Sequence, residues 1–286
     1  MWIILSFLTA VCEALKDGLC KKSLQQYDVF TISWAWKVFS LPFIIPLIFF
    51  VPIPEVIPRE FWVALLTGGG LNILATLLYI RAISLSDLSI TLPLLSFTPV
   101  FLLITSPIMV GDIPAPLGFA GVFLIFLGSY ILGIKDRTTI FSPLQAIVKE
   151  PGARLMLMVA LIWSVAANID KIGVMATTPF FWAVCVQSFI AMGLTIVLFI
   201  NRSSMKGRFR TGTGMLLLMG FFTGAGFVFQ MTAISIGLVP YVIAIKRMSI
   251  VLGVLIGGLY FMEKDLKTRL GAAFIMVAGV FLIAFS

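Results

Sequence analysis

The sequence has 286 residues, of which 60% are hydrophobic and only 11% are charged. This balance excludes an ordinary water-soluble domain, because such a domain needs a far more polar surface. The formal net charge is +8, but the basic residues lie in short connections between apolar blocks, which indicates a membrane protein and not a nucleic-acid-binding one. With no histidine and only three scattered cysteines, we expect no metal ion, no cofactor, no disulfide framework and no enzyme activity.

Apolar blocks of about 20 residues follow one another along the chain, the length that a helix needs to cross about 30 Å of hydrocarbon. The blocks are continuous and do not alternate, so helices are expected and not strands. The sequence therefore predicts an all-α membrane protein. Its ten transmembrane helices are predicted at residues 2–20, 28–50, 61–83, 89–110, 115–134, 155–176, 179–200, 214–235, 239–261 and 267–285.

The charges of the connections predict an orientation. The connections after the first, third, fifth, seventh and ninth helices are basic, whereas the other connections and the termini contain only Arg59. Because positive connections stay in the cytoplasm, both termini are predicted to lie outside it, in a multi-pass protein of a bacterial plasma (inner) membrane. The basic residues are Lys21, Lys22, Arg81, Lys135, Arg137, Lys149, Arg154, Arg202, Lys206, Arg208, Arg210, Lys264, Lys267 and Arg269.

The chain also repeats itself. A shift of 151 positions, from 82 to 233, superposes Ala82-Ile83-Ser84 on Ala233-Ile234-Ser235, and Gly128 on Gly279. Nearer the N-terminus a shift of 155, from 13 to 168, lays Glu13-x-x-Lys16 on Asn168-x-x-Lys171.

Each half would contain five helices, an odd number, so the two halves must have opposite orientations in the membrane. Inverted repeats of this kind are typical of secondary transporters, which bind substrate near the midplane where the halves meet. We predict a first repeat at 1–134, a cytoplasmic linker at 135–153 that includes a short amphipathic helix at the interface, and a second repeat at 154–286.

The repeated stretches resemble a known family. Tyr79-Ile-Arg-Ala-Ile-Ser-Leu-Ser-Asp-Leu-Ser, followed by Pro93, Pro99 and Asp112, resembles the EamA repeat of the drug/metabolite transporter superfamily. Ala233-Ile-Ser-Ile-Gly-Leu-Val-Pro, continuing to Phe261-Met-Glu263, Arg269-Leu-Gly271 and Gly279, resembles it as well. The resemblance implies two inverted five-helix repeats around a central cavity and alternating access. It leaves the substrate open, because the family carries amino acids, nucleotide sugars, sugar phosphates and cations.

Ionisable residues lie within the predicted helices, where each costs about 3 kcal/mol or more. Lys171 is about 15 residues beyond the start of helix 155–176, and Lys246 about 7 beyond the start of helix 239–261, so both are expected at one depth. Two lysines and an arginine at one level suit a phosphate or carboxylate. The charges are Glu13, Lys16, Asp17, Lys37, Asp170, Lys171, Lys246 and Arg247.

Lys246-Arg247-Met-Ser, with a lysine in the sixth helix, is similar to the plastid triose-phosphate/phosphate translocators of the same superfamily. That resemblance implies a phosphate clamp of Lys171, Lys246 and Arg247, although the residues that would read the rest of a triose phosphate have no match here. The alternative is structural pairing, in which Lys171 pairs with Asp170 and Arg247 bonds to backbone. Adjacent helix residues point about 100° apart, which makes Asp170 a poor partner for Lys171.

The first helix offers another alternative. Glu13, with Lys21 and Ser23, matches in spacing the first helix of small multidrug resistance proteins, whose buried glutamate binds protons and cationic drugs. A structural Glu13–Lys37 or Asp17–Lys37 pair is the competing interpretation.

We predict a secondary transporter of a small anionic, phosphorylated metabolite. Its substrate-binding residues would be Lys171, Lys246, Arg247, Asn168 and Tyr241, and Glu13, Lys16, Lys37 and Asp170 would gate or couple transport. The rivals are an amino-acid or metabolite exporter, a proton-coupled exporter of cations centred on Glu13, and an intramembrane lipid-phosphate enzyme or non-transporting partner. The expected partners are the bilayer and the anion, with the chain as a monomer or homodimer.

Overall fold

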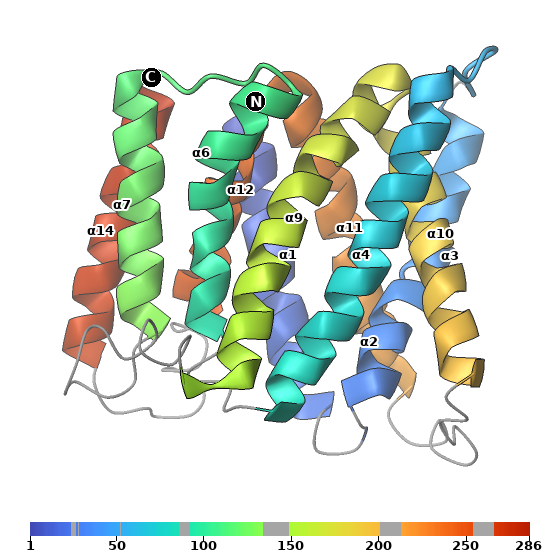
Figure 1. Ribbon diagram of the computed structural model, residues 1–286, viewed down its shortest axis with the longest axis horizontal. Helices are drawn as coiled ribbons and strands as arrows, with labels where there is room; N and C mark the ends of the chain where they lie inside the picture. Colours follow the sequence, from blue (N-terminus) through green and yellow to red (C-terminus); the bar gives the residue numbers. More distant parts are fainter. Residues whose placement is uncertain are drawn as a thin grey trace.

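In the residues that it describes, the computed structural model is a bundle of ten helical passes that run side by side (Figure 1). It describes residues 1–23, 27, 29–51, 53–85, 92–133, 149–200, 213–253 and 266–286. Both termini lie at one end of the bundle, as an even number of passes requires. We call this end the terminal end and the opposite end the linker end.

The first half begins with a single long helix and continues in shorter pieces. The second pass is divided because prolines begin new helical segments near its middle, at Pro42 and Pro46. The elements are α1 (Trp2–Ser23), α2 (Val29–Val38), α3 (Leu41–Ile44), η1 (Ile45–Phe50), α4 (Arg59–Leu85), η2 (Leu92–Ser96), α6 (Phe97–Met109) and α7 (Pro116–Gly133).

The second half contains α9 (Pro151–Ala176), α10 (Pro179–Ile200), α11 (Thr213–Ile236), α12 (Val239–Lys246) and α14 (Leu266–Ala284). The predicted helices agree with these within a few residues where the chain is described. The consequential difference is α9, which begins at Pro151 and not at 155, because proline fits the first position of a helix. Most of the predicted linker, residues 135–148, and the end of predicted helix 239–261 lie outside the described residues.

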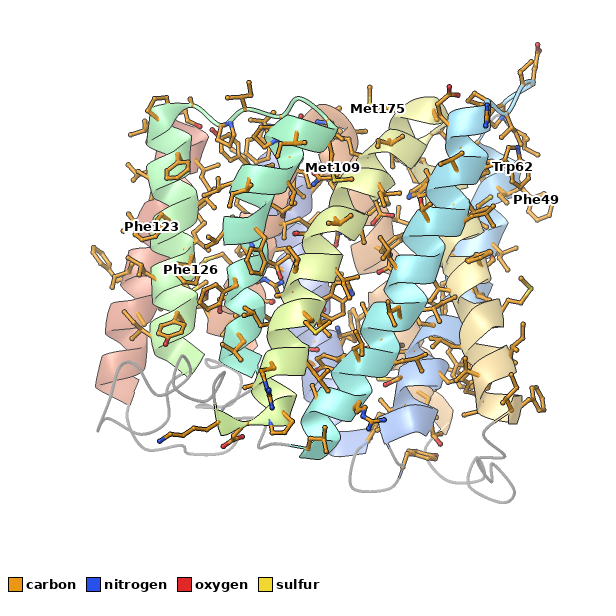
Figure 2. All side chains as sticks on the ribbon, in the orientation of Figure 1. Phe49, Trp62, Met109, Phe123, Phe126 and Met175 are labelled. Atoms are coloured by element: carbon orange, nitrogen blue, oxygen red, sulfur yellow. The ribbon has the colours of Figure 1, made fainter. Side chains whose placement is uncertain are left out.

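The outer surface of the bundle is apolar. Phe49, Trp62 and Phe123 point away from the helices (Figure 2), and the side chain of Phe49 is 83% exposed. Five described segments are long and apolar enough to span a bilayer: Thr31–Phe50, Arg59–Tyr79, Pro151–Ala176, Pro179–Ile200 and Gly214–Ile236. A surface of this kind is stable against lipid and not against water.

Helix packing repeats across the two halves. The α4 helix lies along α9, and α11, the equivalent of α4, lies along α1, the equivalent of α9. The remaining equivalent elements pair with each other: α2 with α10, α6 with α12 and α7 with α14. This exchange pattern is what a two-fold relation between the halves produces.

The two halves run in opposite directions, as predicted. Gly121 of α7 faces Gly279 of α14, while Gly128 faces Ala272, so residue numbers rise along one helix as they fall along the other. A Cβ atom on Gly279 would lie 2.6 Å from the Gly121 carbonyl oxygen, and one on the equivalent Gly128 would lie 2.7 Å from that of Ala272. Inverted five-helix repeats are therefore confirmed.

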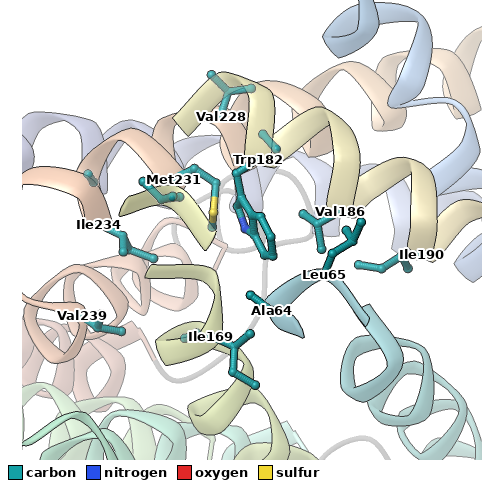
Figure 3. Close-up of a cluster of buried hydrophobic side chains, with 14 of the residues drawn as sticks. Ala64, Leu65, Ile169, Trp182, Val186, Ile190, Val228, Met231, Ile234 and Val239 are labelled. Carbon is teal, nitrogen blue, oxygen red and sulfur yellow. The ribbon is translucent and has the colours of Figure 1, made fainter. Parts of the chain in front are cut away.

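Among the described residues, the largest apolar cluster surrounds Trp182 of α10 (Figure 3). The fully buried indole packs edge-on against Phe61 of α4 at 5.5 Å. Its face lies on Gly173 of α9, where an added Cβ would be 2.3 Å from the ring. Trp182 thus holds α4, α9 and α10 together. Its contact with Gly173 lies one turn of α9 from Asp170.

Candidate functional site

The intramembrane charges fall into two groups. One is the set of Glu13, Lys16, Asp17, Lys37, Asp170, Lys246 and Arg247, which we call the charge cluster. The other is an ion pair between Lys171 and Asp112 near the terminal end.

Within the charge cluster, three residues of α1 bind one another. Lys16 is buried and contacts the carboxylate of Glu13, and its Nζ also lies 3.1 Å from Asp17 Oδ1. The ammonium group lies over the ring of Trp36 on α2, 4.7 Å from its centroid. Asp17 shares this one lysine with Glu13 and keeps 60% of its side chain exposed.

Lys246 connects the two halves. Its Nζ donates a 2.9 Å hydrogen bond to Gln230 Oε1 on α11 and lies 3.7 Å from Glu13 Oε2 on α1. The positive charge of the next residue, Arg247, interacts with the negative charges of Glu13 and Asp17. Its Nε is buried and has no hydrogen-bond partner among the described residues. A buried N–H group of this kind is an unsatisfied donor that can bind an acceptor oxygen.

Lys37 also has a neutral hydrogen-bond partner. Its Nζ donates to Gln187 Oε1 at 3.0 Å and lies 5.7 Å from the ring centroid of Phe227. Gln187 is fully buried, and its Nε2 has no partner in the part of the chain that is described. The predicted Glu13–Lys37 and Asp17–Lys37 pairs are not what the structure shows, because Glu13 and Asp17 contact Lys16 instead.

Asp170 is the most deeply buried carboxylate of the cluster, with 4% exposed. Its Oδ1 accepts a 3.0 Å hydrogen bond from Trp182 Nε1. The positive charges of Lys37 and Lys246 interact with Asp170 through space, but neither lysine is close enough to form an ion pair with it. The alternative Lys171–Asp170 pair is likewise not observed.

Lys171 instead binds the first half of the protein. Its Nζ lies 2.7 and 2.9 Å from the two carboxylate oxygens of Asp112 and donates to the Gly237 carbonyl at 3.2 Å. Asp112 follows Gly111, whose φ of 71° favours glycine. The backbone N–H of Val239, the first residue of α12, donates to Asp112 Oδ2 at 2.7 Å. One buried carboxylate thus binds a lysine and caps a helix of the other half.

The structure does not bring Lys171 to Lys246 and Arg247. Because α9 begins at Pro151, Lys171 is 20 residues and about 30 Å along it, near the terminal end. Its contact with Gly237 places it level with the start of α12, whereas Lys246 is 7 residues and about 10 Å further into the bundle. The predicted common depth is not observed, because α9 begins four residues before the predicted start at 155 and Lys171 lies correspondingly closer to the terminal end.

The other two predicted ligands also contribute to contacts between helices. Asn168 is fully buried, accepts a 2.6 Å hydrogen bond from Ser106 and donates to Thr105 at 3.0 Å, which joins α9 to α6. The hydroxyl of Tyr241 accepts from the Ala115 N–H at 3.0 Å, and its ring stacks on Trp2. Neither side chain has a recorded contact with the charge cluster.

Sequence reasoning missed two residues of these sites. Asp112 lies between two predicted helices, a position typical of an acid that caps the next helix, whereas in the structure it caps α12 of the other half. Trp182 carried no signal, because its indole N–H reaches Asp170 only after α9 and α10 have packed.

The charge cluster has a positive surplus when every group is ionised. The cluster contains four basic and three acidic side chains, which leaves one positive charge. Separately, the described residues contain no group of three acidic, cysteine or histidine side chains that could hold a metal ion. Buried surplus charge is costly unless a ligand compensates it. The bases are Lys16, Lys37, Lys246 and Arg247, and the acids are Glu13, Asp17 and Asp170.

Inverted helical repeats with ionisable groups enclosed where they meet are typical of membrane transport proteins. The chain belongs to the EamA-like transporter family, whose model matches residues 1–134 and 150–285. It is therefore a multi-pass transporter and not an enzyme. No curated protein matches the chain. A crystal structure of a protein shares the fold with a TM-score of 0.79 at 14% identity, covering 99% of this chain and 96% of the other.

Proposed function

We propose that this transporter carries a small organic anion by alternating access, with a phosphorylated metabolite as the first candidate. The observation that carries the proposal is the hydrogen bonding of three cationic side chains. Lys37 and Lys246 donate hydrogen bonds to neutral glutamine oxygens, and the Arg247 Nε has no partner among the described residues. An incoming anion offers Lys37 and Arg247 a charged acceptor and competes with the more distant Glu13 carboxylate for Lys246.

The bound acidic group would lie between Lys246 and Arg247, with Lys37 facing it across the cluster. A planar guanidinium supplies two parallel donors and an ammonium supplies a point charge, a combination that suits phosphate and carboxylate oxygens alike. Lys171 would not take part while Asp112 holds it. Its ammonium would become free only when the terminal end opens.

Alternating access would then use the two groups of charges differently. The Asp112–Lys171 pair closes the terminal end, which the basic connections predict to face outside the cytoplasm of a bacterial plasma membrane. Glu13 of one half lies 3.7 Å from Lys246 of the other, so an anion that binds Lys246 weakens a contact between the halves. Substrate binding would in this way favour the rocking movement.

The rival exporter of cations is less well supported. A cationic substrate at Glu13 would have to displace Lys16 and compete with Lys246, both of which already neutralise that carboxylate. An exporter of amino acids remains a specific alternative, because a carboxylate would use the same donors and the exposed Asp17 could hold an ammonium group.

Replacing Lys246 tests the proposal. Binding of inorganic phosphate, sugar phosphates, amino acids and quaternary ammonium compounds to purified protein would be compared by calorimetry. Lys246→Gln should weaken anion binding about 10- to 150-fold, since a hydrogen bond to a charged group contributes about 1.5–3 kcal/mol. Lys22→Gln, an exposed lysine at the linker end of α1, is the matched control. Tight binding of ammonium compounds, with no response to any anion, would overturn the proposal.

A further inference from the structure

We propose that Asp170 is a proton-binding site that couples anion movement to a proton gradient, so that one proton and one anion cross together. This inference rests on the proposed function and adds the coupling ion. It concerns a carboxyl group that the anion site itself does not need.

The surroundings of Asp170 suit a neutral acid. The group is buried in α9, and its one recorded hydrogen-bond partner in the described chain is the Trp182 indole. That indole is fixed, because it is fully buried between Phe61 and Gly173. A protonated carboxyl group keeps this hydrogen bond through its carbonyl oxygen. An ionised carboxylate loses its hydration on burial and gains only one hydrogen bond from a neutral donor, so its desolvation is poorly compensated.

The other two carboxylates of the cluster differ in this respect. Glu13 and Asp17 both lie against Lys16, so their negative charges are compensated. The charged groups that face Asp170 are Lys37 on α2 and Lys246 on α12, and both already donate to glutamines. From α4, α6, α10 and α11, no further ionisable group of the described residues faces it. Asp170 is therefore the carboxyl whose charge is least compensated.

Protonation of Asp170 changes what the cluster can bind. With the proton on, the surplus rises from one positive charge to two, which matches the charge of about −1.5 to −2 on a phosphate monoester near neutral pH. Each ligand then favours the other, and by linkage the proton strengthens anion binding as much as the anion strengthens proton binding.

The charges balance over one cycle. A proton from water on one side of the membrane adds to a carboxylate oxygen of Asp170, and the anion binds Lys246 and Arg247. When the anion leaves on the other side, Lys37 and Lys246 again face Asp170 without a competing negative charge, and the O–H bond gives its proton to water there. The sign is fixed: anion affinity should fall as pH rises, by at most about tenfold per pH unit for one coupled proton.

The test uses Asp170→Asn in full-length protein reconstituted in liposomes that enclose a pH-sensitive dye. Glucose 6-phosphate and inorganic phosphate serve as probe anions. Asparagine copies the neutral acid and still accepts from Trp182, so anion-for-anion exchange should persist while anion uptake no longer acidifies the lumen. Calorimetry should show anion binding that has lost its pH dependence. Glu60→Gln, an exposed acid in the first turn of α4, is the control and should retain both.

A second variant keeps the inference testable if Asp170→Asn does not fold. Trp182→Phe removes the hydrogen bond that helps the ionised form, so the pH midpoint of anion binding should move upward. Infrared difference spectra should also show a protonated-carboxyl band on anion binding, absent from Asp170→Asn. Proton movement in Asp170→Asn equal to that of the original protein would overturn the inference. Failure of the original protein to bind any anion at any pH would instead overturn the proposed function.

Discussion

Lys37 and Gln187 show how a single residue pair separates stability from function. The lysine is a costly group to enclose in a bilayer, yet its partner is a neutral amide. A pair whose purpose was to hold α2 against α10 would be replaceable by apolar side chains of similar size. A pair that waits for an anion would not.

The double variant Lys37→Met/Gln187→Leu distinguishes these purposes. The free energy of unfolding should stay within about 1 kcal/mol of the original or rise, because both polar partners are removed together. Anion transport should be lost. The single variant Lys37→Met, which leaves the Gln187 oxygen unpaired, should be less stable by about 1–3 kcal/mol. Anion transport that persists in the double variant, at a stability measured by denaturation in detergent, would show that the pair is structural.

Which charges enter the membrane could be predicted residue by residue, but their partners could not. Composition and block length are enough to place Glu13, Lys16 and Lys246 within helices. Whether Lys171 meets Lys246 or Asp112 depends on where α9 begins, and four residues correspond to about 6 Å. That distance exceeds the reach of an ion pair, so an ordinary error at a helix end changed the predicted site.

At the scale of elements, α10 is held against α9 by the packing of Trp182 on Gly173, which has no side chain. The indole of Trp182 occupies the space that a side chain at position 173 of α9 would need. This contact also sets the distance from Trp182 to Asp170, so packing and chemistry share it.

Gly173→Ala should therefore destabilise the protein by about 1–3 kcal/mol, because the added methyl group overpacks a site that cannot expand. Thermal unfolding in detergent measures the loss. Gly70→Ala is the control, since nothing lies within 4 Å of its added Cβ in α4, and alanine should there be neutral or slightly stabilising. Equal stability of the two variants would contradict the described packing of Trp182.

The existence, length and order of the helices could be predicted from apolar block length, because lipid allows few other structures. The divided second pass could not, since Pro42 and Pro46 are compatible with either a kink or a break. The pairing of α4 with α9 also depends on tertiary contacts that periodicity alone does not contain.

For the whole molecule, the parity of five helices in each repeat was sufficient to predict the opposite orientation of the halves. Parity could not predict which end of the bundle is closed in the structure. In the structure, Asp112 of one half holds Lys171 and the N-terminus of α12 of the other, at the terminal end.

Asp112→Asn should shift the equilibrium toward a state open at that end. With the three natural cysteines replaced by serine and a reporter introduced by Tyr241→Cys, labelling by a water-soluble maleimide should become about 10- to 150-fold faster, which corresponds to the loss of about 1.5–3 kcal/mol. Glu60→Gln should leave the rate unchanged. A reporter that stays equally protected in Asp112→Asn would show that the ion pair does not hold the end closed.

The glycine contact between α7 and α14 has a mechanical consequence. Where Gly121, Gly128 and Gly279 bring two backbones together, neighbouring side chains of the two helices fill the remaining space and leave little room for sliding. The two halves can roll about this line more easily than they can slip along it. We therefore expect this contact to act as the pivot between the halves, with the smallest displacement of atoms during a transport cycle.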